Sequence, residues 1–448
     1  MIKVITYGTF DLFHKGHELL LKRAKALGDY LIVGVTSDDY DKFRGKIYVQ
    51  NSLVERMSAI ESTGLADKII VEEYEGQKID DIRRYGVDIF TVGSDWNGCF
   101  DYLNEFCKVI YLPRTDGISS SELRSDFRQV KIGIKGSSNI NVVEKFINES
   151  KFVNGVIIEY ICLTQLTNDD CIHPDISYTT NYDEMLSKVD AVYVISSPES
   201  HYNDTKIALN ALKHVLCESP IATNRQQCIE LFSLAKQNNL ILMDGIKTAY
   251  SQAYERLVLM VKGGKIGDVV SVDSVCTSLK DPLEIDSPLF NNWNSISTWA
   301  PLALLPVFQI FGTSYSNKLI YSKFLDKDKN IDIFTKIDFA YKTGVASIKV
   351  AKGSKSEGCL IISGTRGYVY VPAPWWKTDY FEIRYENFTE NQRFFYQLEG
   401  EGIRYEIVAF VKAIESGINL SYVSQNISLS IASIIDDFDK RVEMVEID

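Results

Sequence analysis

Ten residues, 8–17, separate an expected strand from an expected helix and contain two of the five histidines of the chain. Their sequence is GTFDLFHKGH. Residues 2–7 alternate in polarity and are rich in β-branched side chains, which predicts a strand. Residues 18–27 carry apolar side chains at helical spacing. The run therefore lies at a strand-to-helix turn, where backbone N–H groups and the helix dipole favour phosphate. His14 and His17 add hydrogen-bond donors, and Gly16 between them lets a ligand come close.

Two further interpretations of the histidine pair stay open at this point. Histidines at this spacing are also typical of metal sites, and single histidines are often structural. The sequence shows no second cluster of cysteine, histidine and carboxylate residues that would complete a metal shell. The pattern therefore favours a phosphate site and predicts no metal site in the protein.

Composition limits the remaining function classes. A chain of 448 residues with a net charge of −12 predicts two or three domains and argues against a surface for nucleic acid. The eight cysteines are scattered and are expected to be reduced and mostly buried. No apolar run is long enough to span a bilayer, and the first residues predict a strand and not a signal peptide. We expect a cytoplasmic protein without membrane insertion.

Residues 1–128 predict an open parallel α/β sheet as the first domain. Strand patterns alternate with helical ones, and the strands are expected at Tyr30–Thr36, Lys68–Glu72, Asp88–Gly93 and Lys108–Leu112. Ligands of such sheets bind beyond the carboxyl ends of the strands, which is where residues 8–17 fall.

Three further segments of this domain suit an anionic ligand. Arg44 and Lys46 lie on a polar stretch before a helix expected near Asn51, although a single lysine of this kind is usually just solvated. Gly93-Ser94-Asp95-Trp96 ends a strand. Residues 112–121 read LPRTDGISSS, and their three serines precede an expected helix. One serine is expected to cap the helix, while the others bind phosphate. The alternative is a helix cap without a ligand, and Arg114 nearby favours the phosphate site.

Together these four segments resemble the HxGH nucleotidyltransferase superfamily and, within it, the glycerol-3-phosphate cytidylyltransferases. The resemblance implies that CTP and glycerol 3-phosphate, or a related polyol phosphate, give CDP-glycerol and pyrophosphate for a cell-surface polymer such as teichoic acid or capsule. It also implies Mg2+ with CTP and a homodimer. The reaction needs positioning and charge neutralisation more than a strong base.

The resemblance assigns a role to each matching residue. His14, His17, Lys46 and Arg114 are the expected catalytic residues. Expected nucleotide-binding residues are Gly8, Thr9, Phe10, Asp11, Gly16, Asp95, Ser119, Ser120 and Ser121. Asp11 is expected to orient the first turn, while Arg56 and Trp96 are expected near the acceptor.

Residues 129–245 and 246–448 resemble the two domains of the Gfo/Idh/MocA oxidoreductases, a Rossmann domain and an α/β domain with a large open sheet. The resemblance rests on residues 190–198, 213–224, 364–376 and 402–406. The chain departs from that family at chemical positions. Gly136 is present, but Ser138 and Asn141 replace the second and third glycines of the dinucleotide turn. The family motif Glu-Lys-Pro is Glu218-Ser219-Pro220, and the family's catalytic histidine or tyrosine would fall in the apolar stretch 299–302.

Two hypotheses follow for the second half. It is either an NAD(P)-dependent oxidoreductase that supplies or modifies the polyol phosphate, or a degenerate fold kept for assembly. The joint loss of three chemical positions favours the degenerate fold, with His201 and His214 as structural residues. For the chain as a whole, a non-catalytic scaffold and a nucleotidyltransferase acting on a cofactor precursor also stay open.

Overall fold

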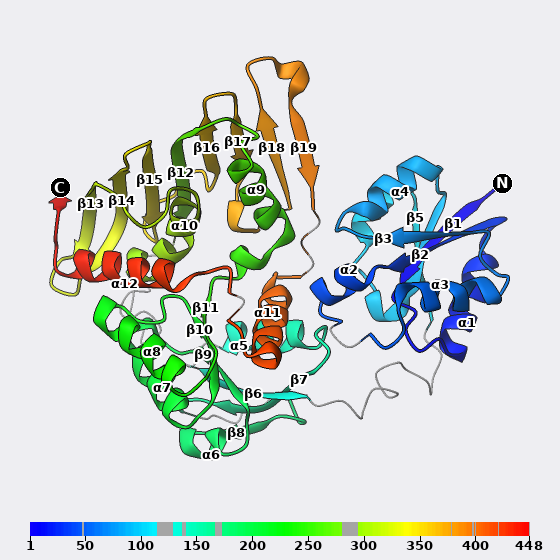
Figure 1. The fold of residues 1–448 in the computed structure, drawn as a ribbon, viewed down its shortest axis with the longest axis horizontal. Helices are drawn as coiled ribbons and strands as arrows, with labels where there is room; N and C mark the ends of the chain where they lie inside the picture. The colour runs from blue at the N-terminus through cyan, green and yellow to red at the C-terminus, as the bar shows by residue number, and fades with distance from the viewer. Residues whose placement is uncertain are drawn as a thin grey trace. The chain divides into compact units, whose positions relative to one another are not determined.

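The computed structural model describes residues 1–46, 49–113, 129–136, 140–165, 173–279, 294–377, 379–396, 398, 400–419 and 421–447. Figure 1 shows their fold. The chain divides into two compact units, which are residues 1–129 with 152–155, and residues 130–151 with 156–448. The domain boundaries at 128 and 245 remain proposals. Arg114, Ser119, Ser120, Ser121 and Ser138 lie outside the described residues.

Unit 1 contains a parallel five-stranded sheet in the order β3-β2-β1-β4-β5. The strands are β1 (Lys3–Gly8), β2 (Tyr30–Thr36), β3 (Lys68–Glu72), β4 (Ile89–Gly93) and β5 (Lys108–Leu112). Between them lie α1 (Lys15–Lys25), α2 (Asp38–Phe43), α3 (Leu53–Ser62), α4 (Gln77–Tyr85), η1 (Ser94–Trp96) and η2 (Asp101–Glu105). Three of the four expected later strands match to the residue, and the helix after β1 begins three residues earlier than expected.

Both faces of this sheet are covered, because successive residues of a strand point to opposite faces. Val4 packs in one cluster with Leu21 of α1 and Ile60 of α3. Ile5 packs in a second cluster with Ile82 of α4. Side chains therefore fill the space on both faces of the sheet, and a ligand is expected to bind at the carboxyl ends of the strands.

The first part of unit 2 is a second parallel sheet, of six strands in the order β11-β10-β9-β6-β7-β8. The strands are β6 (Val130–Gly136), β7 (Val156–Cys162), β8 (Ser177–Thr179), β9 (Ala191–Ile195), β10 (His214–Glu218) and β11 (Leu242–Gly245). Its helices are α5 (Ile140–Ser150), α6 (Tyr182–Leu186), α7 (Pro198–Asn210) and α8 (Arg225–Gln237), with η5 (Lys247–Tyr250) after β11.

The rest of unit 2 is built on a mixed nine-stranded sheet, ordered β19-β18-β17-β16-β12-β15-β14-β13-β20. Its strands are β12 (Val269–Thr277), β13 (Asn317–Asp326), β14 (Ile331–Ala340), β15 (Val345–Ala351), β16 (Leu360–Gly364), β17 (Tyr368–Val371), β18 (Tyr380–Arg384), β19 (Gln392–Phe395) and β20 (Met444–Glu446). The helical elements are α9 (Gln252–Lys262), α10 (Ser295–Phe311), η8 (Trp375–Lys377), η9 (Phe388–Glu390), α11 (Ile403–Ser416) and α12 (Gln425–Asp439).

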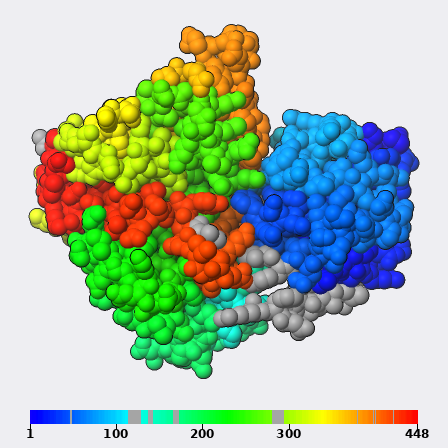
Figure 2. Space-filling model, in the orientation of Figure 1, coloured from blue at the N-terminus to red at the C-terminus, as the bar shows by residue number. Residues whose placement is uncertain are grey.

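Helix α10 packs on β12, β14 and β15, and α12 packs on both α10 and α8. Figure 2 shows α12, in red, along the surface of unit 2 beside α8, in green. The expected fold class is confirmed, with a parallel-sheet unit followed by a Rossmann-type sheet and a large further sheet. Among the described residues, the helices include none with the length and apolar character needed to cross a bilayer.

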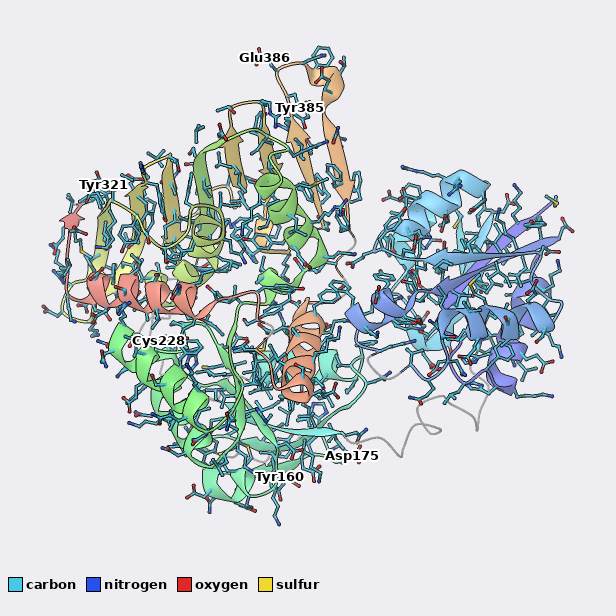
Figure 3. The ribbon with its side chains drawn as sticks, in the orientation of Figure 1. Tyr160, Asp175, Cys228, Tyr321, Tyr385 and Glu386 are labelled. Atoms are coloured by element: carbon cyan, nitrogen blue, oxygen red, sulfur yellow. The ribbon has the colours of Figure 1, made fainter. Side chains whose placement is uncertain are left out.

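The cysteines of the described residues fit a reduced protein. Seven of them are free thiols, and four of these are buried. Cys228 on α8 is an example (Figure 3), and burial raises the pKa of its thiol. A buried thiol with a raised pKa packs as a small apolar side chain.

Candidate functional site

The turn between β1 and α1 brings the two expected histidines face to face. The rings of His14 and His17 are stacked, with their centroids 3.9 Å apart. Phe10 and Phe13 pack against His17, with centroids 5.5 and 5.6 Å from its ring. The turn reaches this shape through left-handed backbone at Phe10 and Leu12, where φ is 55° and 46°. The aromatic residues therefore hold the pair in one orientation.

The backbone around His14 fixes which of its ring nitrogens carries the proton. His14 caps α1, and its Nδ1 accepts a hydrogen bond from the backbone N–H of Gly16 at 3.1 Å. A neutral imidazole that accepts at Nδ1 carries its proton on Nε2. The cap therefore makes Nε2 of His14 a hydrogen-bond donor, as contact with a phosphate oxygen requires. Gly16 contributes through its N–H.

Lys46 comes to the same turn through Thr9. Its Nζ donates to Thr9 Oγ1 at 2.7 Å, and Thr9 Oγ1 donates to Asp41 Oδ1 at 2.6 Å. Asp41 is buried, and this burial raises the pKa of its carboxyl group against the opposing effect of Lys46, Thr9 and the nearby arginines. The structure thus brings Lys46 to the end of β1, next to the histidine turn, although Lys46 and Thr9 are far apart in the sequence.

Arg56 has a different environment from the one expected for a residue that binds the acceptor. Its side chain is fully buried. Nη1 donates to the carbonyl oxygens of Thr9 and Thr36 at 2.6 and 2.8 Å, and ion pairs join Arg56 to Asp38 and Asp41. The guanidinium therefore joins the ends of β1 and β2 to α2. We assign it this positioning role in place of the predicted contact with the acceptor phosphate.

Asp11 lies between the histidine turn and the loop before α3. Its Oδ1 accepts hydrogen bonds from the backbone N–H groups of Gln50 and Asn51, both at 3.0 Å, and Asn51 Oδ1 accepts from the N–H of Leu12 at 3.0 Å. Asp11 is 1% exposed, so it holds the loop before α3 against the histidine turn. At Gly8, a Cβ would lie 3.1 Å from the ring of Phe10, so a larger residue would press on that ring.

Asp95 and Trp96 lie on η1, directly after β4. Because β4 is paired in parallel with β1, their carboxyl ends meet at one edge of the sheet. Asp95 is exposed and Trp96 is half-buried. These two residues therefore lie at the same edge as the histidine turn, as expected, while their contacts with ligands remain predictions.

The sequence did not indicate a second polar cluster at this edge. Glu72, the last residue of β3, is buried and forms ion pairs with Lys78 of α4 and with Arg44, whose Nη1 lies 3.5 Å from its Oε2. Lys78 Nζ also lies 5.0 Å from the ring centroid of Tyr7, whose hydroxyl donates to Asp81 at 2.8 Å. The sequence could have indicated this cluster, because Glu72 ends an expected strand and parallel sheets place functional groups at the carboxyl ends of their strands.

Unit 2 has its own pocket at the carboxyl edge of β9, β10 and β11, with a volume of about 520 Å3. Glu218 and Ser219 line it, and Tyr193 donates a hydrogen bond to Glu218. Burial raises the pKa of Glu218. Trp299, Pro301 and Leu302 also line the pocket, which agrees with the apolar character expected of residues 299–302.

The remaining expected positions of unit 2 lie in the backbone framework. Gly136 ends β6, and a Cβ there would lie 3.2 Å from Leu163. His201 is buried, with its two ring nitrogens 2.8 Å from the carbonyl oxygens of Pro220 and Ser196. His214 Nδ1 accepts from the N–H of Ile241 at 3.0 Å. Both histidines therefore hold backbone, as the structural interpretation expects.

Two family models match the chain. Residues 5–126 match a model described as cytidylyltransferase-like, and residues 129–246 match one described as an oxidoreductase family with an NAD-binding Rossmann fold. This chain is 51% identical to the glycerol-3-phosphate cytidylyltransferase of Bacillus spizizenii over 126 residues, which are 28% of this chain and cover 97% of that enzyme. The enzyme of the same name from Staphylococcus aureus is 44% identical over 126 residues, with 95% of it covered.

Solved structures resemble unit 2 in fold. A 3-ketoreductase from Actinomadura kijaniata, in complex with NADP and TDP-benzene, has a TM-score of 0.62 at 17% identity, covering 72% of this chain and all of the other. A UDP-N-acetylglucosamine 3-dehydrogenase from Acidithiobacillus ferrooxidans has a TM-score of 0.58 at 13% identity, covering 71% and 99%. At these identities the likeness concerns the fold alone.

Proposed function

The chain belongs, through residues 5–126, to the cytidylyltransferase-like family, and on that premise we propose that it transfers the cytidylyl group of CTP to glycerol 3-phosphate or a related polyol phosphate. The products are CDP-glycerol, or the corresponding CDP-polyol, and pyrophosphate. The observation that carries the proposal is the stacked pair His14 and His17 at the β1–α1 turn, with Lys46 held to the same strand end by Thr9. All of these residues lie within the segment that matches the cytidylyltransferase-like model.

In this proposal the acceptor phosphate oxygen attacks the α-phosphorus of CTP in line, and the bond to the bridging oxygen of the leaving pyrophosphate breaks. The acceptor is already an anion near neutral pH, so no strong base is required. His14 donates from Nε2 to an α-phosphate oxygen, and His17 acts beside it on the charge that builds in the transition state. Lys46 neutralises charge on the triphosphate.

The finer assignments extend this proposal. Arg114, Ser119, Ser120 and Ser121 complete the triphosphate site, CTP enters as its Mg2+ complex, and Asp95 and Trp96 lie near the nucleotide or acceptor. The family resemblance further supports a cytoplasmic homodimer that supplies an activated polyol for a cell-surface polymer such as teichoic acid or capsule.

A pyrophosphate-release screen tests the proposed reaction. The four nucleoside triphosphates are each offered with glycerol 3-phosphate, a pentitol phosphate and phosphoethanolamine. The proposal predicts release with CTP and a polyol phosphate together, and none with either alone. Preference for ATP would instead favour a cofactor-precursor nucleotidyltransferase, and the absence of release in every pairing would favour a scaffold.

For unit 2 we propose a second, separable hypothesis, an NAD(P)-dependent oxidoreductase, because residues 129–246 match the NAD-binding Rossmann model. Gly136 keeps the first glycine of the dinucleotide turn, but Ser219 stands where that family has a lysine. Titration with NADH and NADPH, followed by fluorescence, decides the matter. Saturable micromolar binding supports the oxidoreductase, and its absence supports a degenerate fold kept for assembly.

A further inference from the structure

Unit 1 contains a segment that lies outside the part of the chain that matches the cytidylyltransferase-like model. The model matches residues 5–126, whereas residues 152–155, the added segment, also belong to unit 1. Along the chain the added segment joins α5, which ends at Ser150, to β7, which begins at Val156. In two glycerol-3-phosphate cytidylyltransferases, 126 aligned residues cover 97% and 95% of the enzyme, which leaves almost no chain for such a segment. The chain studied here therefore enters unit 1 a second time.

The added segment packs on the loop that carries Lys46. The backbone N–H of Asn154 donates to the carbonyl oxygen of Gly45 at 2.8 Å. Val153 is buried, and a Cβ on Gly45 would lie 2.7 Å from the carbonyl oxygen of Phe152 and 3.2 Å from Cα of Val153. The backbones thus approach so closely that a side chain on Gly45 does not fit, and its φ of 104° also favours glycine. Because Gly45 directly precedes Lys46, these contacts fix the backbone beside a proposed catalytic residue.

The same loop also has contacts with the histidine turn and with α2. The N–H of Lys46 donates to the carbonyl oxygen of Asp41 at 2.8 Å, and its Nζ donates to Thr9 Oγ1 at 2.7 Å. Two separate sets of contacts therefore meet at residues 44–46. Because a misplacement of about 1 Å can lower the rate of an enzyme by about 10²-fold, loss of either set is expected to affect transfer through Lys46.

Phe152 of the added segment contacts Trp96. The two ring centroids are 5.7 Å apart, and the ring planes are inclined by 32°. Trp96 also contacts Phe100, with the ring centroids 5.9 Å apart. The two phenylalanine rings thus restrict the orientation of Trp96, which we place near the nucleotide or acceptor. Phe152 is itself 37% exposed, so its replacement is expected to leave the core of unit 1 intact.

We propose that the added segment is a positioning element of the cytidylyltransferase site. Val153 and Asn154 hold the backbone of residues 44–46, and Phe152 orients the ring of Trp96. The inference rests on the proposed cytidylyl transfer and deepens it with residues from outside the family match. These residues act through Lys46 and Trp96, so they are positioning residues and not catalytic ones. The site is therefore not complete within residues 1–128.

A double-mutant cycle in the full-length protein tests the link to Lys46. The glycine variant carries Phe152→Gly, Val153→Gly and Asn154→Gly, which keeps the length of the chain and removes the packing contacts. We expect kcat/KM for CTP to fall by about tenfold in the glycine variant. Combined with Lys46→Ala, the same changes are expected to cause almost no further loss, because both act through one group. Losses that multiply would overturn the proposal.

The matched control carries the same kind of change at an exposed turn of unit 2. It combines Asn387→Gly, Phe388→Gly and Thr389→Gly, where Phe388 is 79% exposed. We expect this control variant to keep the parental kcat/KM for CTP. An equal loss in the control and glycine variants would show that the effect is not specific to the added segment and would overturn the proposal.

Phe152→Ala tests the link to Trp96. We expect KM for glycerol 3-phosphate to rise by about fivefold while kcat changes little, because Trp96 then orients the acceptor less well. Phe152→Tyr keeps an aromatic ring beside Trp96 and is expected to restore the parental KM. A fall in kcat without a change in KM, or no change in either, would overturn the role given to Phe152.

Hydrogen–deuterium exchange separates this inference from the proposed function, because it needs no substrate. We expect the amides of residues 41–46 to exchange at least threefold faster in the glycine variant than in the parent and the control variant. Equal exchange would overturn the contact between the added segment and this loop. A parent that releases no pyrophosphate would contradict the proposed function, while exchange still decides whether the segment holds the loop. Circular dichroism and a thermal melt report whether each variant is folded.

Discussion

Strands β1 and β6 each end at the carboxyl edge of a parallel sheet and are followed by a helix, and the residues that follow the two strands differ. After β1, the turn carries a stacked histidine pair, with a lysine bonded to the same strand end. After β6, Gly136 remains, but the sequence has lost the other glycines of a dinucleotide turn. Similar scaffolds therefore differ in their chemistry. A parallel sheet supplies the place for a phosphate, while a few side chains decide whether it is used.

The largest expected effect is at the first turn. His17→Ala removes the ring that we propose acts on the transition-state charge, so pyrophosphate release from CTP and glycerol 3-phosphate is expected to fall by about 10³. His214→Ala, in unit 2, is the matched control and is expected to keep the parental rate. Retention of the rate by the His17 variant would show that the first turn is not the working site.

A smaller loss is expected from Lys46→Ala. This change removes the charge that we propose neutralises the triphosphate, and kcat/KM for CTP is expected to fall by about 10². Lys42→Ala, four residues earlier and exposed, is the control with the same change in charge and is expected to have little effect. Equal losses in the two variants would mean that only general surface charge matters.

Arg56→Met tests whether the first turn depends on Arg56 for stability. It removes the guanidinium that pairs with Asp38 and with the buried Asp41, so the free energy of unfolding is expected to drop by about 3–5 kcal/mol in chemical denaturation. Arg83→Met, on the exposed side of α4, is expected to change it by about 0.5 kcal/mol or less. A stable Arg56 variant with a raised KM for the acceptor alone would instead support a contact between Arg56 and the acceptor.

The smaller of the two expected effects on stability concerns one buried carboxyl group in unit 2. Burial raises the pKa of Asp244 from its ordinary value of 3.8 to about 6, against the effect of Ser428 and Ser219. A raised carboxyl pKa favours folding at low pH, and that contribution is lost as the pH rises through 6. Asp244→Asn is therefore expected to gain stability over the parent between pH 4 and pH 7, by up to about 3 kcal/mol.

The matched control for that variant is Asp328→Asn, at the exposed β13–β14 turn. Its stability relative to the parent is expected to vary little over the same pH range. Denaturation curves at several pH values measure both variants. A pH-independent difference for Asp244→Asn would contradict a raised pKa of this carboxyl group.

The sequence predicted strands better than it predicted the partners of charged residues. Alternation of apolar residues identified β2, β3 and β5 to the residue, because period and burial are local properties. It did not predict that Arg56 would be enclosed by the carbonyls of Thr9 and Thr36, since those contacts depend on how α2 and α3 pack. The sequence also did not predict that Lys145, Lys247 and Lys377 would form ion pairs with Glu401, because these residues come together only in the folded chain.

The most direct test of the central claim is 31P NMR of the full-length protein with CTP, Mg2+ and glycerol 3-phosphate, and no nicotinamide cofactor. We expect that diphosphate resonances of CDP-glycerol and free pyrophosphate appear in equal amounts, and that both form about 10³-fold more slowly in the His17→Ala variant. No product, or a product that forms only after NADH or NADPH is added, would contradict the claim that the first turn alone performs the transfer.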